Sequence, residues 1–383
     1  MINISDSLAC SGCTACASVC KFQAISMEPD ALGFLYPKVD GAKCVDCGLC
    51  NNVCAFQAPD ERRQGWPQTY LMQHVNPCEV LKSKSGGAFV VLSDVILQHG
   101  GVVYGVKLNR EYLAEHDSAT TPLERDLFRG SKYIQSDIQG VFAKVKADLK
   151  EGKTVLFSGT PCQVAGLKAF IDERFIEKLY LIDILCHGVA SPAIWKDYLH
   201  TIESQKKKKI QRCIPRDPKL GWDNSIDTFF FEDGTQYSSD YFTGYVYHKW
   251  ITLRMSCSVC PFTSLNRVSD ITIGDAWGAK KVEPEFDKDN LGGSIILVNT
   301  EKGRTIFKTA KSNMVVVPVD INKMMQPVLK SPTKFHPKRK ALEDAYSKYG
   351  YTYVKFVYLN NTVVAVKTVI RRFLSQVKYS LIR

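Results

Sequence analysis

The chain has 383 residues, of which 45% are hydrophobic and 23% charged, an ordinary composition for a folded protein. This length exceeds what one hydrophobic core usually supports, so we expect a small domain joined to one large or two medium domains. No apolar run is long enough to span a bilayer, and the first residues lack the basic start and apolar stretch of an export signal. These features exclude an integral membrane protein and indicate a cytoplasmic one.

The net charge of +11 raises the question of a nucleic-acid partner. The basic residues are spread along the chain, apart from residues 206–209 and a C-terminal segment without acidic residues after Asp344. No zinc-finger, homeodomain or RNA-recognition signature accompanies them, so we expect no binding to nucleic acid. If the charge has a role, it steers an acidic electron carrier such as a ferredoxin or flavodoxin, or a substrate with carboxylates.

Two cysteine runs dominate the first 60 residues. The spacing C-x2-C-x2-C-x3-C occurs from Cys10 to Cys20 and again from Cys44 to Cys54. This spacing is that of bacterial ferredoxins with two 4Fe-4S clusters, in which the fourth Cys of each run ligates the other cluster. Zinc sites usually take paired C-x2-C spacings, and disulfides suit oxidising compartments, so both alternatives are disfavoured. The sequence therefore predicts one cluster on Cys10, Cys13, Cys16 and Cys54, and the other on Cys44, Cys47, Cys50 and Cys20.

After a charged linker over residues 60–68, strands and helices alternate. We expect strands over residues 69–75 and 101–108 and a helix over residues 88–99, preceded by a loop that ends in Ser85, Gly86 and Gly87. Glycines before a helix start allow close approach of a phosphate, although such a loop is also a common flexible turn. A second polar loop contains Gly130, Ser131, Lys132 and Tyr133 and either holds a cofactor or closes a turn.

A strand–helix–strand unit follows. Residues 153–159 and 178–186 are predicted strands, and Thr160 and Pro161 suit the start of the helix between them. Such units place their strands in parallel, so Cys162 and Cys186 should face the same edge of the sheet, where open α/β sheets bind ligands. The helix N-terminus should also lower the pKa of the Cys162 thiol.

The later part of the chain is richer in strands. A capped helix is predicted over residues 191–204, a hairpin over residues 226–239 with its turn at Asp233-Gly234, and buried strands over residues 270–278 and 294–300. Between them lies a C-x2-C pair. Together with the two cysteines of the strand–helix–strand unit, the pair gives four thiolates, Cys162, Cys186, Cys257 and Cys260, enough for a third cluster, a zinc site or unliganded buried thiols. Cys78 and Cys213 remain as small apolar side chains.

The C-terminal residues 363–382 form a basic amphipathic helix by pattern, with an apolar face of Val366, Ile370, Phe373, Val377 and Leu381. Such a helix packs on its own domain or contacts an anionic membrane peripherally.

Several motifs together resemble the beta-subunit family of coenzyme F-420 hydrogenases and dehydrogenases. They are SKSGGAF, RGSKYIQS, SGTPCQVAGL, LCHGVASP, SCSVCPF and DITIGDAWG, and plant 7-hydroxymethyl chlorophyll a reductase is similar over the same region. The resemblance implies FAD at the two polar loops and a third 4Fe-4S cluster on the four later cysteines. It leaves the proton donor open, with His187 and Lys132 as candidates by position.

The expected fold is an α+β ferredoxin-like dicluster domain, then an α/β domain with a mostly parallel sheet and a β-rich C-terminal part. We expect the divisions 1–60, 69–150, 151–330 and 331–383, the last being a basic helical tail. The resemblance implies an FAD-dependent oxidoreductase that moves electrons between a hydride carrier, by default the deazaflavin, and one-electron partners. Reduction of a surface-polysaccharide intermediate, an electron-transfer subunit bound to a catalytic partner, and a cluster-based redox sensor are the alternatives.

Overall fold

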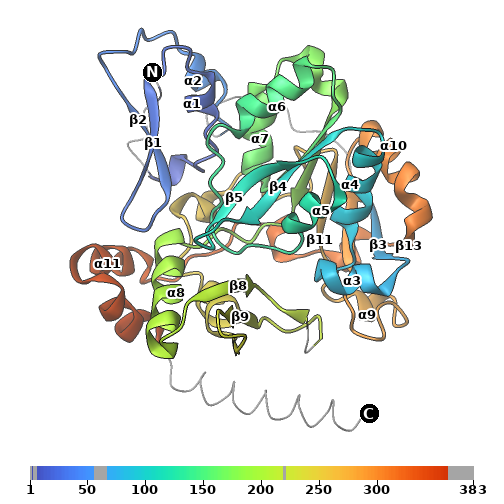
Figure 1. Cartoon of the computed structure of the whole chain (residues 1–383). Coiled ribbons are helices and arrows are strands. Elements are labelled where there is room, and N and C mark those ends of the chain that lie inside the picture. The colour runs from blue at the N-terminus through green and yellow to red at the C-terminus, as the bar shows by residue number, and fades with distance from the viewer. Residues whose placement is uncertain (1, 3–6, 56–66, 219–220, 361–383) are drawn as a thin grey trace.

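The computed structural model describes residues 2, 7–55, 67–218 and 221–360 (Figure 1). Most of the predicted linker over residues 60–68 and all of the predicted tail helix over residues 363–382 lie outside these ranges. Within them, no helix has the length and apolar character needed to cross a membrane.

The N-terminal part is a small α+β unit at one side of the molecule (Figure 1). Strands β1 (Ile25–Pro29) and β2 (Leu35–Val39) form an antiparallel hairpin between the short helices α1 (Ala15–Val19) and α2 (Leu49–Asn52). Each of these helices lies inside one cysteine run, so the hairpin brings the two runs together.

A large mixed sheet forms the centre of the molecule. Its order is β13-β3-β12-β11-β7-β6-β4-β5. Strands β4, β6, β7 and β11 pair in parallel, and β3 has their direction because two antiparallel pairings separate it from β11. The predicted fold class is therefore confirmed. The strands are β3 (Gln68–His74), β4 (Val102–Leu108), β5 (Ala114–Ala119), β6 (Val155–Gly159), β7 (Leu179–Ile184), β11 (Ile271–Asp275), β12 (Ser294–Val298) and β13 (Met314–Pro318).

Helices cover both faces of this sheet. Leu156 of β6 packs toward α4 (Ala88–Gln98) and α10 (Glu301–Ala310), whereas its neighbours Val155 and Phe157 pack toward α6 (Val141–Lys150) and α7 (Pro161–Phe170). Because successive strand residues point to opposite faces, a strand covered on both faces must be apolar throughout. Cover on both faces therefore explains why apolar residues follow one another without alternation in β6.

A second core lies below the sheet in Figure 1. Helix α8 (Pro192–Lys206) packs on a three-stranded antiparallel sheet of β8 (Ile210–Ile214), β9 (Asp227–Phe231) and β10 (Gln236–Ser239), and α11 (Arg339–Val354) completes this core. The pairing of β9 with β10 confirms the predicted hairpin. Shorter helices are α3 (Pro77–Ser83), α5 (Pro122–Arg125) and α9 (Ala279–Val282).

The interpretation of the segment after β3 as loop alone is wrong, because it contains α3. The Asn76 side chain accepts a hydrogen bond from the backbone N–H of Cys78, and Pro77 occupies the first helical turn. Asparagine followed by proline is a helix start signal. Strands β5, β8 and β13 were also not predicted; each is an edge strand of its sheet, and β8 also follows a lysine run.

Candidate redox site

Two cavities in the N-terminal part separate the eight cysteines into the two predicted sets. One cavity is lined by the set that joins the first run to the last cysteine of the second, namely Cys10, Cys13, Cys16 and Cys54; we call it the proximal cavity. The other, which we call the distal cavity, is lined by Cys20, Cys44, Cys47 and Cys50. The exchange of the fourth cysteine between the runs is the arrangement that the ferredoxin spacing predicts.

Backbone amides surround these sulfurs. The N–H groups of Gly12 and Ala24 donate to Sγ of Cys10 and Cys20, both at 3.3 Å, and Ile2 N–H donates to Cys50 Sγ at 3.1 Å. Burial raises the pKa of the Cys13 thiol to about 12. A thiol in such surroundings ionises when a metal cation binds it, and the amide donors then stabilise the anionic sulfur.

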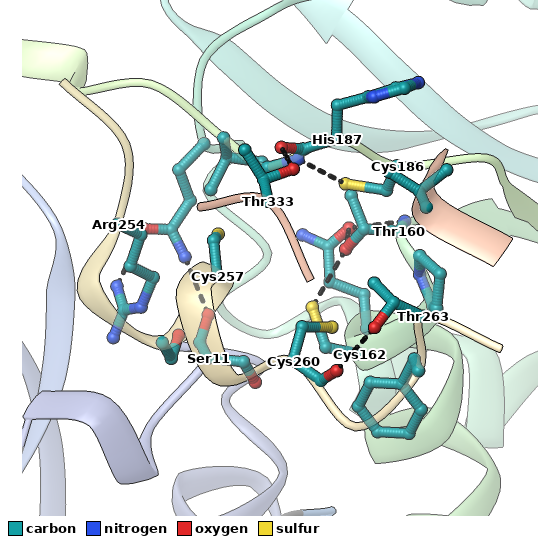
Figure 2. A pocket seen from close by; sticks show the side chains of 18 of the residues that line it. Ser11, Thr160, Cys162, Cys186, His187, Arg254, Cys257, Cys260, Thr263 and Thr333 are labelled. Atoms are coloured by element: carbon teal, nitrogen blue, oxygen red, sulfur yellow. Dashed lines mark hydrogen bonds between the residues drawn. The ribbon is translucent and has the colours of Figure 1, made fainter. Parts of the chain in front are cut away.

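A third cavity lies where β6, α7 and β7 meet (Figure 2). Strands β6 and β7 are parallel neighbours, as predicted, and Gln163 Oε1 accepts from Thr160 N–H at the start of α7. Cys162 lies in the first turn of α7, and Cys186 lies just past β7. Cys257 within the 3-10 helix η7 (Met255–Val259) and Cys260 after it complete the lining, and the four thiols converge on one space.

The electrostatics of this cavity correct one expectation. Burial raises the pKa of the Cys162 thiol, although its helix N-terminus was expected to lower it, because desolvation outweighs the favourable contact with Thr160. Burial also raises the pKa of Cys257 to about 11 and of Cys260 to about 12. Gly188 N–H donates to Cys186 Sγ at 3.4 Å, so this cavity repeats the amide–sulfur contacts of the N-terminal part.

No group of three or more His, Cys, Asp or Glu side chains in the described ranges is close enough to hold a single metal ion. This applies to the N-terminal cysteine sets and to the third cavity alike.

The remaining cysteines lie apart from these cavities. Cys213 is buried, as expected of a small apolar side chain, whereas Cys78 is exposed on α3.

A buried ion pair that was not predicted from the sequence lies at the wall of the third cavity. Arg267 Nη2 lies 2.9 Å from Asp183 Oδ2, and Arg267 Nη1 donates to Phe262 O at 2.7 Å, directly after the C-x2-C pair. Asp183 is completely buried within β7. An aspartate inside an otherwise apolar strand was the available signal for a buried basic partner.

The two polar loops expected to contact FAD are neighbours. A Cβ atom on Gly130 would lie 2.9 Å from the Lys84 side chain, and Arg129 Nη1 donates to Ser83 Oγ at 3.2 Å. At Gly86, the reason for a glycine is not the expected close approach of a phosphate. A Cβ there would lie 2.1 Å from Met72 O and 2.4 Å from Ser294 N, so this glycine allows the loop to pack on strands β3 and β12.

Two lysines in these loops lack a carboxylate partner within the described ranges. Lys84 Nζ donates to Pro215 O at 2.6 Å, and Lys132 Nζ donates to Leu127 O and Arg129 O, both at 3.0 Å. Burial lowers the pKa of Lys84 to about 8, and burial together with repulsion from Lys84 lowers that of Lys132 well below its usual range. An anion bound beside these two buried lysines would stabilise their charged forms, which the neutral carbonyl partners do not balance.

Aromatic contacts join these loops to the third cavity. The rings of Tyr133 and Tyr247 meet edge to face at 4.8 Å, and the Tyr247 hydroxyl donates to Gly188 O at 3.0 Å. His187 follows Cys186, but its imidazole points away from the sulfurs (Figure 2) and lies 5.4 Å from the Trp277 ring. Burial lowers the pKa of His187.

The third cavity and the proximal cavity share a wall. Ser11 lines both of them, and helix α7 carries Cys162 at one end of the wall and Gly166 one turn later. A Cβ atom on Gly166 would lie 2.7 Å from Cys13 Sγ. The N-terminal part therefore packs on α7, and the proximal-cavity residue Cys13 contacts the helix that carries Cys162.

Gly166→Ala is expected to destabilise the protein by about 1–3 kcal/mol, because the new methyl group overlaps Cys13 in a packed contact. Without that contact, alanine in a helix would stabilise it by about 1 kcal/mol. Anaerobic thermal unfolding measures the effect. Gly41→Ala is the matched control, since a Cβ at Gly41 meets nothing within 4 Å; an equal change in both variants would contradict the assigned contact.

Comparisons with known proteins agree with this geometry. Residues 9–58 match the 4Fe-4S dicluster domain, and residues 152–323 match the C terminus of the beta subunit of coenzyme F420 hydrogenase/dehydrogenase. The chain is thus an iron-sulfur oxidoreductase. Residues 152–323 form a domain similar to the C terminus of the coenzyme F420 hydrogenase/dehydrogenase beta subunit, with a dicluster domain in front, as the motifs suggested.

Among solved structures, the chain matches one from the F420-reducing [NiFe] hydrogenase complex of Methanosarcina barkeri at 15% identity and a TM-score of 0.46. The alignment covers 75% of this chain and 95% of that chain. No curated protein matches the sequence.

Proposed function

We propose that this protein is an FAD-dependent oxidoreductase with three 4Fe-4S clusters, which passes electrons between a hydride carrier or organic substrate and one-electron partners. The observation that carries the proposal is the shared wall between the third cavity and the proximal cavity, where Ser11 lines both cavities and Gly166 of α7 packs against Cys13. A third redox centre in this cavity would lie beside the dicluster domain.

The third cluster would be held by Cys162, Cys186, Cys257 and Cys260. All four thiols face one cavity, and their number suits a cubane. The ion pair of Arg267 with Asp183 fixes the segment after the C-x2-C pair through the carbonyl of Phe262. The residues present therefore fit a cluster.

FAD would bind at the two adjacent polar loops. Lys84 and Lys132 would be stabilised as cations by its phosphates, and the amides at the start of α4, after Ser85-Gly86-Gly87, would add donors. Gly130, Ser131 and Tyr133 belong to the second loop. Tyr133 also contacts Tyr247, whose hydroxyl donates to Gly188 O at the third cavity, so a flavin held here would lie next to the third cluster.

A flavin exchanges two electrons with a hydride donor and single electrons with clusters. The chain's own residues set the path between them. Electrons would move between the polar loops, the third cavity, the proximal cavity and the distal cavity, in either direction. Cys47 at the distal cavity is exposed, as are the neighbouring Phe22 and Val45, at 50% and 57%. An acidic ferredoxin, a flavodoxin or a catalytic partner subunit would exchange electrons there.

The proton-donor candidates differ in position. The imidazole of His187 faces away from the sulfurs, toward Trp277, and its lowered pKa keeps it neutral near pH 7, when it can both accept and donate a proton. Lys132 instead binds two backbone carbonyls of its own loop, which suits a role in holding an anion. We therefore favour His187 for proton transfer and propose that the protein acts in the cytoplasm.

Anaerobic purification with iron, sulfide and flavin quantified per chain tests this function. We expect about twelve irons and one FAD, from three clusters of four irons each. About eight irons without flavin would overturn the proposal and leave a dicluster electron carrier or redox sensor. Flavin bound within a stable complex with another subunit would identify an electron-transfer subunit. Once flavin and iron are established, turnover of the deazaflavin is compared with turnover of lipid-linked sugars, which distinguishes the two substrate classes. Vesicle flotation of the full chain tests peripheral membrane contact.

A further inference from the structure

Arg254 lies where the N-terminal part meets the rest of the molecule. Its side chain is 1% exposed. Arg254 Nε donates to Cys10 O and Nη2 donates to Leu35 O, both at 2.9 Å, while Nη1 donates to Gln135 Oε1 at 2.9 Å. The guanidinium also stacks on Tyr36, with its Cζ atom 4.1 Å from the ring centroid.

This buried cation has no carboxylate within ion-pair distance among the described residues, in contrast to Arg267, which pairs with Asp183. The Asp30 side chain is nearby, but its Oδ1 already accepts the backbone N–H groups of Leu32 and Phe34 at 2.9 Å. A buried charge without a counter-ion is strongly destabilising, so Arg254 requires negative charge from another source.

The nearest source is the proximal cysteine set. Arg254 Nη2 lies 3.5 Å from Cys10 Sγ, and Arg254 also lines the third cavity, where its charge acts on Cys162 and Cys257. A 4Fe-4S cluster with four thiolate ligands is anionic and gains one more negative charge on reduction. Net charge and hydrogen bonds to the sulfurs are among the factors that set cluster potentials.

We propose that Arg254 is the electrostatic bridge between the proximal and third clusters, with the proximal cluster as its main counter-ion. Its positive charge and its hydrogen bond to Cys10 stabilise the reduced proximal cluster and raise the midpoint potential of that cluster. The proximal cluster, which lies where the two parts of the chain meet, is therefore reduced more readily than it would be without Arg254. The role of the third cavity here rests on the proposed function, whereas the contact with Cys10 concerns the dicluster domain alone.

EPR-monitored potentiometry of the dicluster domain in the full chain tests this inference. Arg254→Gln removes the charge, so we expect the one-electron reduction constant of the proximal cluster to fall at least tenfold, which corresponds to ~59 mV. The potential of the distal cluster should change much less. Lys43→Gln, which removes an exposed charge next to Cys44, is the matched control and should leave the proximal potential unchanged.

A second variant covers the case in which Arg254→Gln does not fold. Gln135→Glu keeps the shape of the side chain but places a carboxylate against the guanidinium, so it should lower the proximal potential in the same direction. Unchanged proximal potentials in an iron-loaded variant would overturn the inference. This result is distinguishable from failure of the proposed function, because both ferredoxin clusters are measured whether or not FAD and the third cluster bind.

Discussion

Cys257→Ala/Cys260→Ala is expected to remove one cluster and leave the dicluster domain intact. Iron should fall from about twelve to about eight atoms per chain, because two of the four thiols that line the third cavity are lost. FAD and the two ferredoxin EPR signals should remain, since their residues lie outside the substituted segment. Electron transfer from reduced flavin to the ferredoxin clusters should be abolished, because the shared wall then has no redox centre on its flavin side.

Anaerobic stopped-flow reduction, with iron and zinc quantified in the same samples, measures this effect. Cys78→Ala is the matched control, because Cys78 is exposed on α3 and lies outside all three cavities. Unchanged iron with lost zinc in the double variant would identify a structural zinc site. Unchanged iron and unchanged electron transfer would show that the third cavity holds no redox centre.

The cysteine sets and the strand–helix–strand unit were predictable because they depend on local sequence. The spacing within each run determines which sulfurs meet, and the apolar run of β6, followed by Thr160 and Pro161, predicts a buried strand and a helix start. Parallel pairing with β7 then places Cys162 and Cys186 at one edge. Short-range patterns were sufficient for this part of the site.

The residues that join the parts of the site were not predictable in this way. Arg254 contacts Cys10 across 244 positions of the chain, and the contact of Tyr133 with Tyr247 depends on how the second core packs. Such contacts are set by tertiary packing, which has no periodic signal in one sequence. Gly86 shows the same limit, because its sequence context suggested ligand approach while its neighbours are the backbones of two strands.

Arg267→Met is expected to be the most destabilising single substitution at the site, at about 3–5 kcal/mol, because it leaves Asp183 buried and unpaired. The variant also loses the hydrogen bonds from Arg267 to the carbonyls of Phe262 and Ser264, which hold the segment after Cys260. We therefore expect lost iron at the third cavity together with a lower guanidinium midpoint, measured anaerobically by circular dichroism and cluster absorbance.

Two further variants separate charge from packing. Arg174→Met removes an arginine that is exposed by 73% and pairs weakly with Asp172 at 3.9 Å, so its cost should stay below about 1 kcal/mol. Arg267→Met/Asp183→Leu removes both buried charges and should recover most of the lost stability, since an apolar pair can replace a buried ion pair. Recovery of stability without recovery of the third-cavity iron would show that the ion pair positions the cysteine segment. A double variant as unstable as Arg267→Met would instead show that the loss arises from packing and not from the unpaired charge of Asp183.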